Sequence, residues 1–141
     1  MARILWDTNI FIYLFEGHPK FNARVVSIRK SMNARQDELF ATTMTVGEIL
    51  VHPLSRGDVE LQDKYRQFFR SGAVTLLPFD FEASLHYARI RQDRGISPPD
   101  AIQLACGAAQ GIDLFITNDD RLLGKPIQGV GFVMSLQQAP L

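Results

Sequence analysis

The sequence has a single cysteine, Cys106, among its 141 residues. A disulfide-stabilised scaffold is therefore excluded. A lone thiol is typical of a reducing compartment, which we expect to be the cytoplasm. We interpret Cys106 as a buried, unreactive thiol, because the residues around it are small and apolar and offer no group that would activate it.

Long hydrophobic runs are also missing. The longest, Ile10 to Phe15, has six residues, which is far too short to cross a membrane. The chain opens with Met1, Ala2 and Arg3 and lacks the pattern of a signal peptide. We therefore expect no membrane-spanning segment and no signal peptide.

An excess of charge of one sign is absent too. The 15 Lys and Arg residues balance the 15 Asp and Glu residues, which argues against a uniformly basic, nucleic-acid-coating surface but allows a local basic rim. Glycine-rich phosphate loops and the nucleophile elbow of serine hydrolases are not found. The three histidines, His18, His52 and His86, fall in separate elements with no cysteine pair, so we do not expect zinc.

Short apolar runs alternate with amphipathic segments along the chain. Strands are expected over residues 3–6, 38–43, 73–77, 113–117 and 129–134. Helices are expected over 10–15, from 19 to about 35, from 45 to about 52, from 58 to 72, from 80 to about 94, from 97 to 111, and over 118–123. The third helix should end or kink near His52, because Pro53 lacks an amide hydrogen.

This alternation predicts an α/β fold with a mostly parallel sheet covered by helices on both faces. No linker or repeat interrupts it, so we expect a single domain over residues 1–141 that ends in a short polar tail, 137–141. In such sheets ligands bind at the carboxyl ends of the strands.

Four acidic residues fall near the expected carboxyl ends of strands. Asp7 ends the first strand and Asp119 follows the fourth, while Glu48 and Asp100 are expected in the first turns of helices. The alternative is helix capping, because the capping-box spacing recurs three times, in the pairs Thr45 and Glu48, Ser97 and Asp100, and Thr117 and Asp120. Singly, each of the four acids fits a cap better than a catalyst. Asp7 resists that interpretation best, because it ends a strand that is expected to be central.

Taken together, the four acids favour a metal site. Two carboxylates about 4 Å apart repel by about 4 kcal/mol at an effective dielectric constant near 20, so a fold retains such a cluster when a cation occupies it. Ligands that offer only oxygen favour Mg²⁺ or Mn²⁺. A cation of this kind suits hydrolysis of a phosphodiester.

The segments around these acids resemble the ordered motifs of PIN-domain nucleases, and most closely those of VapC-like ribonuclease toxins from bacterial toxin–antitoxin pairs. They are Leu5–Asn9, Val46–Ile49, Pro99–Ala105 and Phe115–Asp119, and the resemblance extends from Arg3 to Met134. It implies a parallel sheet of about five strands sandwiched by helices, a divalent metal, and metal-dependent endoribonuclease activity. The helix after Glu48 usually continues in this family, so His52 and Pro53 depart from the pattern.

The resemblance also implies roles for individual residues. Asp7 and Asp100 would be the firmest metal ligands, while Glu48 and Asp119 would bind the metal through water or place the nucleophile. Asp119 is preferred over its neighbour Asp120 because of its position in the motif. Supporting hydrogen bonds are expected from Thr8, Asn9 and Thr117.

Partners follow from the same resemblance: an RNA substrate and an antitoxin protein. Aromatic residues are abundant, notably Tyr65, Phe68 and Phe69, and core packing is the first explanation. A homodimer interface or a groove for an antitoxin helix is the second. Two other functions stay open, a PIN-domain ribonuclease of RNA processing or decay without an antitoxin, and a non-catalytic PIN-like binding module.

Overall fold

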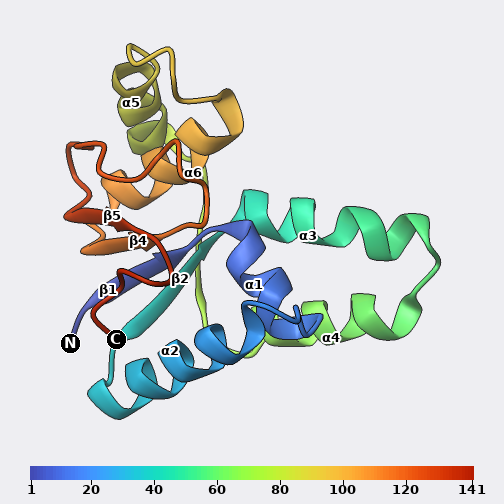
Figure 1. Cartoon of the computed structure of the whole chain (residues 1–141). Helices are drawn as coiled ribbons and strands as arrows, with labels where there is room; N and C mark the ends of the chain where they lie inside the picture. Colours follow the sequence, from blue (N-terminus) through green and yellow to red (C-terminus); the bar gives the residue numbers. More distant parts are fainter.

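The centre of the molecule is a five-stranded sheet in which all neighbouring strands are parallel, in the order β3-β2-β1-β4-β5 (Figure 1). This computed structural model describes all residues, 1–141. The strands are β1 (Arg3–Trp6), β2 (Glu38–Thr42), β3 (Thr75–Leu77), β4 (Leu114–Ile116) and β5 (Phe132–Met134). The predicted α/β class and five-stranded sheet are confirmed.

Six helices cover the sheet, and α3 and α4 form a hairpin that projects to one side of the molecule (Figure 1). They are α1 (Thr8–Phe15), α2 (Asn22–Arg35), α3 (Thr43–Ser55), α4 (Val59–Arg70), α5 (Phe81–Ile90) and α6 (Pro98–Ala109). The predicted caps Asp58, Asp80 and Ser97 each accept a hydrogen bond from a backbone N–H in the first turn of their helix. None of the helices is both long enough and apolar enough to cross a membrane.

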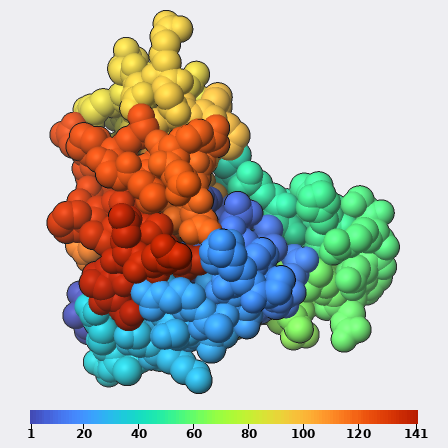
Figure 2. Space-filling model, viewed as in Figure 1, coloured from blue at the N-terminus to red at the C-terminus, as the bar shows by residue number.

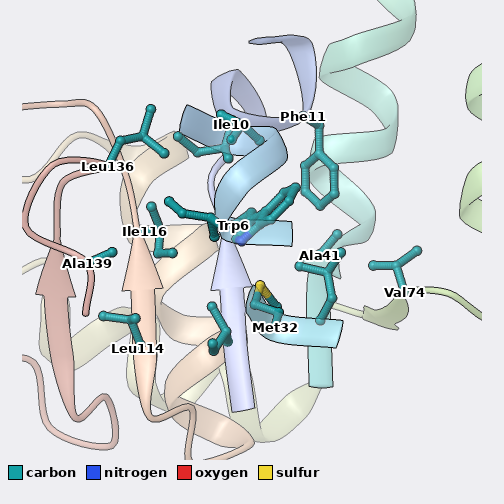
Figure 3. Packing of buried hydrophobic residues seen from close by; sticks show 14 of the residues in the cluster. Trp6, Ile10, Phe11, Met32, Ala41, Val74, Leu114, Ile116, Leu136 and Ala139 are labelled. Atoms are coloured by element: carbon teal, nitrogen blue, oxygen red, sulfur yellow. The ribbon is translucent and has the colours of Figure 1, made fainter. Parts of the chain in front are cut away.

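Side chains of the strands alternate between two cores, one on each face of the sheet. Ile4 and Trp6 lie in the core beneath α1, α2 and α4, where Figure 3 shows Trp6 beside Ile10, Phe11 and Met32. Leu5, between them, points into the opposite core against α5 and α6. This pattern explains the uniformly apolar strands, because a sheet buried on both faces has no polar side.

The aromatic residues of α4 pack inward. Tyr65 is 0% exposed and Phe69 is 5% exposed, and the Phe69 ring stands edge-on to Phe11 at 5.3 Å between centroids. Phe11 in turn lies 5.0 Å from the ring of Trp6. The first explanation of the aromatic content, core packing, is therefore the correct one for these residues.

Several helix boundaries differ from the prediction. α2 begins at Asn22 rather than Pro19, and α5 ends at Ile90 rather than near Arg94. α3 neither starts at Thr45 nor ends at His52: it runs through Pro53 to Ser55. The Pro53 nitrogen has no hydrogen to donate within the helix. The Pro53 carbonyl accepts from the Asp58 N–H at 2.9 Å and from the Gln62 side-chain amide of α4 at 3.1 Å, so contacts with the following segment hold this last turn.

Residues 118–123 do not form the predicted short helix: 118 and 119 are irregular, and a turn covers 120–124. Thr117 would have been its cap, but the hydroxyl of Thr117 is used elsewhere: it donates to Asp7 and accepts from the N–H of Asp119. The loop after β4 is thus shaped by contacts with the end of β1, which sequence spacing does not reveal.

The C-terminal residues are held against α2. The Arg24 guanidinium donates to the carbonyls of Leu136, Ala139 and Leu141 at 2.8–2.9 Å, and Ala139 is buried. Figure 2 shows this segment packed beside the start of α2. The carbonyl groups at the end of the chain therefore have partners.

Candidate active site

A pocket of about 250 Å³ lies at the carboxyl edge of the sheet, and no hydrophobic residue lines it. Strand β1 is central, between β2 and β4, which is where ligands bind in open parallel sheets. All four predicted acids line this pocket, together with three neutral polar residues, a proline and one arginine: Asp7, Glu48, Asp100, Asp119, Thr8, Asn9, Gln103, Pro99 and Arg121.

Asp7 is held between the end of β1 and the start of α1. Its Oδ1 accepts from the Thr8 N–H at 2.8 Å, which caps α1, and its Oδ2 accepts from the Thr117 hydroxyl at 2.7 Å. Trp6 and Ile116 are partners in the β1–β4 register, so the two residues that follow them, Asp7 and Thr117, emerge side by side. The sheet itself therefore fixes the position of this carboxylate.

Burial changes the protonation of Asp7. Its pKa is raised from 3.8 to about 6: desolvation is the largest cause, the hydrogen bonds from Thr117 and Thr8 oppose the rise, and the nearby carboxylates of Asp100 and Glu48 add to it. A carboxyl group held this way is costly to ionise unless a cation compensates its charge. Strongly perturbed acids of this kind concentrate at functional sites.

Glu48 lies in the second turn of α3, not in its first turn as predicted. The N-cap is Thr42, whose hydroxyl accepts from the Thr45 N–H at 3.2 Å. The proposed capping box of Thr45 and Glu48 is therefore wrong. Instead, Glu48 Oε1 accepts from the Thr8 hydroxyl at 2.7 Å, which ties this exposed acid to the residue next to Asp7.

A buried network beneath the pocket orients that Thr8 hydroxyl. Gln103, 2% exposed, donates through Nε2 to Thr45 at 2.7 Å and to Thr8 at 3.1 Å, and its Oε1 accepts from Thr42 at 2.7 Å. Thr8 and Thr45 also share a contact of 2.9 Å between their hydroxyl oxygens. The Thr8 hydroxyl oxygen accepts a hydrogen bond from Gln103, so the one hydroxyl hydrogen of Thr8 can be donated to Glu48.

Asp100 stands in the first turn of α6, as predicted. Its backbone N–H donates to the Ser97 hydroxyl at 3.4 Å, and that hydroxyl donates to Asp100 Oδ2 at 2.9 Å. Asp100 therefore takes part in the cap of α6 and also lines the acidic pocket. The amino end of α6 also favours negative charge at this position.

Asp119 and Asp120 face different pockets. Asp119 lines the acidic pocket, while Asp120 lines a neighbouring one beside Asn118 and Lys20. Arg121 binds Asp119 through Nε at 3.0 Å and Nη2 at 2.7 Å, and these hydrogen bonds hold the pKa of the Asp119 carboxyl below its usual range. Only Asp119 therefore joins the other three acids.

The donor chemistry of the pocket fits a hard divalent cation, since its lining offers four carboxylates and several neutral oxygens. The geometry is not a closed cage: no group of three or more His, Cys, Asp or Glu side chains is arranged to hold a metal ion. Asp7 and Asp119 already spend both carboxylate oxygens on hydrogen bonds. Each Asp7 oxygen accepts a single bond and keeps a lone pair for a cation, whereas Asp119 accepts three hydrogen bonds from Arg121, with which a cation would have to compete.

Gln103 and the roles of Thr42 and Thr45 were not predicted. Gln103 lies one turn after Asp100 on a helix that is otherwise apolar and tightly packed. An uncharged amide on such a face is a detectable signal, because buried polar groups need partners. Its partners come from β2, α1 and α3, and only the fold identifies them.

The fold and site define an α/β protein with an acidic pocket at the carboxyl ends of a parallel sheet. The sequence profile of the PIN domain matches residues 4–126, and the chain belongs to this family. No curated protein sequence matches the chain.

Two solved structures share the fold. One is a chain of VapBC2 from Rickettsia felis bound to a DNA fragment from their promoter, with a TM-score of 0.73, 16% identity and coverage of 94% of this chain and 97% of that one. The other belongs to a toxin–antitoxin complex from Klebsiella pneumoniae, with a TM-score of 0.68, 23% identity and coverage of 90% and 94%.

Proposed function

We propose that the protein is a Mg²⁺- or Mn²⁺-dependent endoribonuclease that acts as the toxin of a type II toxin–antitoxin pair in the cytoplasm. The observation that carries the proposal is the convergence of four carboxylates from β1, α3, α6 and the loop after β4 on one pocket with no hydrophobic lining. Membership of the PIN family supports it.

Asp7 and Asp100 would hold the cation directly, and Asp119 would join them once released by Arg121. When bound, the cation would polarise a phosphoryl oxygen and make a bound water more acidic. Glu48 would orient or deprotonate that water; the hydrogen bond from the Thr8 hydroxyl, which holds one Glu48 oxygen, supports this role. Asn9 lines the pocket and is exposed, so it can hydrogen-bond the substrate.

The toxin role is supported by the two structural neighbours, which come from a VapBC complex and a toxin–antitoxin complex. Exposed apolar side chains on the α3–α4 hairpin, Val51, Leu54 and Val59, are 54–62% exposed and offer a surface for a protein partner or a second copy. Light scattering at tens of micromolar tests this part: a dimer or a co-purifying small protein is expected, and a lone monomer counts against it.

The activity is tested by incubating purified protein with total RNA, with and without Mn²⁺. Wild type should cleave only with metal, and Asp7→Asn should cleave at least ~100-fold more slowly. Asp58→Asn is the matched control, because Asp58 also caps a helix but lies outside the acidic pocket. Equal cleavage by wild type and Asp7→Asn would refute the proposed site.

A further inference from the structure

Arg121 is the one cationic residue that lines the acidic pocket. A phosphodiester is itself anionic, so a pocket with four carboxylates repels it unless positive charge is supplied. The proposed metal would supply part of that charge. Arginine binds phosphate through paired N–H groups in a planar fork, which makes Arg121 a candidate for the rest.

The Arg121 guanidinium is paired with the Asp119 carboxylate. Nε donates to Oδ1 at 3.0 Å and Nη2 to Oδ2 at 2.7 Å, while the Arg121 backbone N–H also donates to Oδ1 at 3.0 Å. Both oxygens of Asp119 therefore accept from Arg121, Oδ1 twice and Oδ2 once. No hydrogen bond involves the Nη1 group, which leaves part of the fork available.

The location of the pair suits an exchange of partners. The Arg121 side chain is 73% exposed and that of Asp119 is 22% exposed, so the guanidinium lies at the mouth of the pocket and the carboxylate further in. A phosphate at the mouth offers the guanidinium the same paired acceptor oxygens that Asp119 offers, so the exchange replaces one charge-assisted pair by another.

We propose that Arg121 is a phosphate-binding residue of the RNA site that Asp119 holds in the RNA-free protein. When RNA enters, the guanidinium moves from Asp119 to a phosphate of the strand, and the released carboxylate becomes free to face the cation. Substrate binding and completion of the acidic site are then one event. This inference rests on the proposed ribonuclease function.

Two measurements on Arg121→Gln test it, and they should change in opposite directions. Mn²⁺ binding without RNA, followed by the rise in melting temperature, should tighten several-fold, because Asp119 loses its competing partner. RNA binding should weaken by about ten-fold, the order of one lost charge-assisted hydrogen-bonded contact. If Arg121 only stabilised the loop after β4, its replacement would neither tighten Mn²⁺ binding nor weaken RNA binding.

RNA affinity is best measured by fluorescence anisotropy of a labelled single-stranded RNA in an Asp100→Asn background, where cleavage should stop. The slope of log affinity against log salt should fall by about 0.7 when one phosphate contact with a single strand is lost. Arg66→Gln is the control. Like Arg121, Arg66 pairs with a nearby aspartate, but its partner Asp63 lies on the exposed face of α4.

The inference is overturned if Arg121→Gln binds RNA with the affinity and salt slope of the Arg66→Gln control, or if its Mn²⁺ affinity does not rise. These results would leave the ribonuclease function intact as long as wild type cleaves RNA. If wild type neither binds nor cleaves RNA, the proposed function fails and this inference fails with it.

Discussion

Asp7→Asn should stabilise the metal-free protein near neutral pH, although it removes a residue of the site. Asp7 is ionised at a cost, since burial and two nearby carboxylates raise its pKa to about 6. Asparagine carries no charge and is as good an N-cap as aspartate, so it can still accept from the Thr8 N–H at the start of α1. Thr117 can accept from the new amide by turning its hydroxyl.

The size of the effect follows from the pKa. A rise from 3.8 to about 6 corresponds to about 3 kcal/mol. Part of this gain is lost because the amide keeps only one acceptor oxygen, so we expect a net stabilisation of about 1 to 3 kcal/mol. For a chain of this size that is a rise in melting temperature of roughly 3 to 10 °C.

The sign depends on pH in a defined way. A carboxyl whose pKa is higher in the folded state binds its proton more tightly there, so the unfolding free energy of wild type falls as pH rises from about 4 to about 6. Asp7→Asn lacks this loss. The difference in unfolding free energy between Asp7→Asn and wild type should therefore be small at pH 4, grow through pH 6 and stay constant above pH 7.

Thermal melts in EDTA between pH 4 and pH 8 measure this difference, with Asp58→Asn as a control for removing a charge from another helix cap. Saturating Mn²⁺ should then favour wild type, since a ligand that binds only the folded state stabilises it. A mutant that melts below wild type in EDTA by the same amount at every pH would show that Asp7 is only a structural cap and would refute this reasoning.

Three further substitutions extend the test. Asp100→Asn should melt above wild type in EDTA and gain less from Mn²⁺, whereas a purely capping Asp100 would cost about 0.5–1 kcal/mol when replaced. Gln103→Leu should lower stability by about 1–3 kcal/mol, because it leaves buried threonine hydroxyls without partners. It should also slow cleavage, because Thr8 would no longer be oriented to hold Glu48. Unchanged cleavage would show that this network does not position Glu48. Gly131→Ala should lower the melting temperature, because a Cβ at residue 131 would clash with the Asp113 carbonyl oxygen. An unchanged melting temperature would show that the backbone at Gly131 can move away from Asp113 without cost.

Much of the fold was predictable because its signals are local. Uniformly apolar runs identified the strands of a sheet buried on both faces, and Asp58, Asp80 and Ser97 marked helix starts through their own side-chain hydrogen bonds. The grouping of the four acids followed from topology, because the carboxyl ends of parallel strands meet at one edge.

The errors arose where tertiary contacts decide between equivalent local signals. Thr42, Thr43 and Thr45 are all possible caps for α3, and the buried hydroxyl of Thr45 is instead committed to Thr8 and Gln103. Thr117 is likewise drawn to Asp7, and no helix follows it. The pairing of Arg121 with Asp119 depends on the turn that replaces that helix.

The proposed activity of the acidic pocket is cleavage of RNA with the help of a divalent cation. The most direct measurement is the rate of cleavage of a labelled single-stranded RNA as Mn²⁺ is titrated into EDTA-treated protein, for wild type and for Asp100→Asn at equal concentration. Wild type should show a saturable, metal-dependent rate, and a folded Asp100→Asn should show a rate at least ~100-fold lower. Cleavage that proceeds equally in EDTA, or equally well in both proteins, would contradict it.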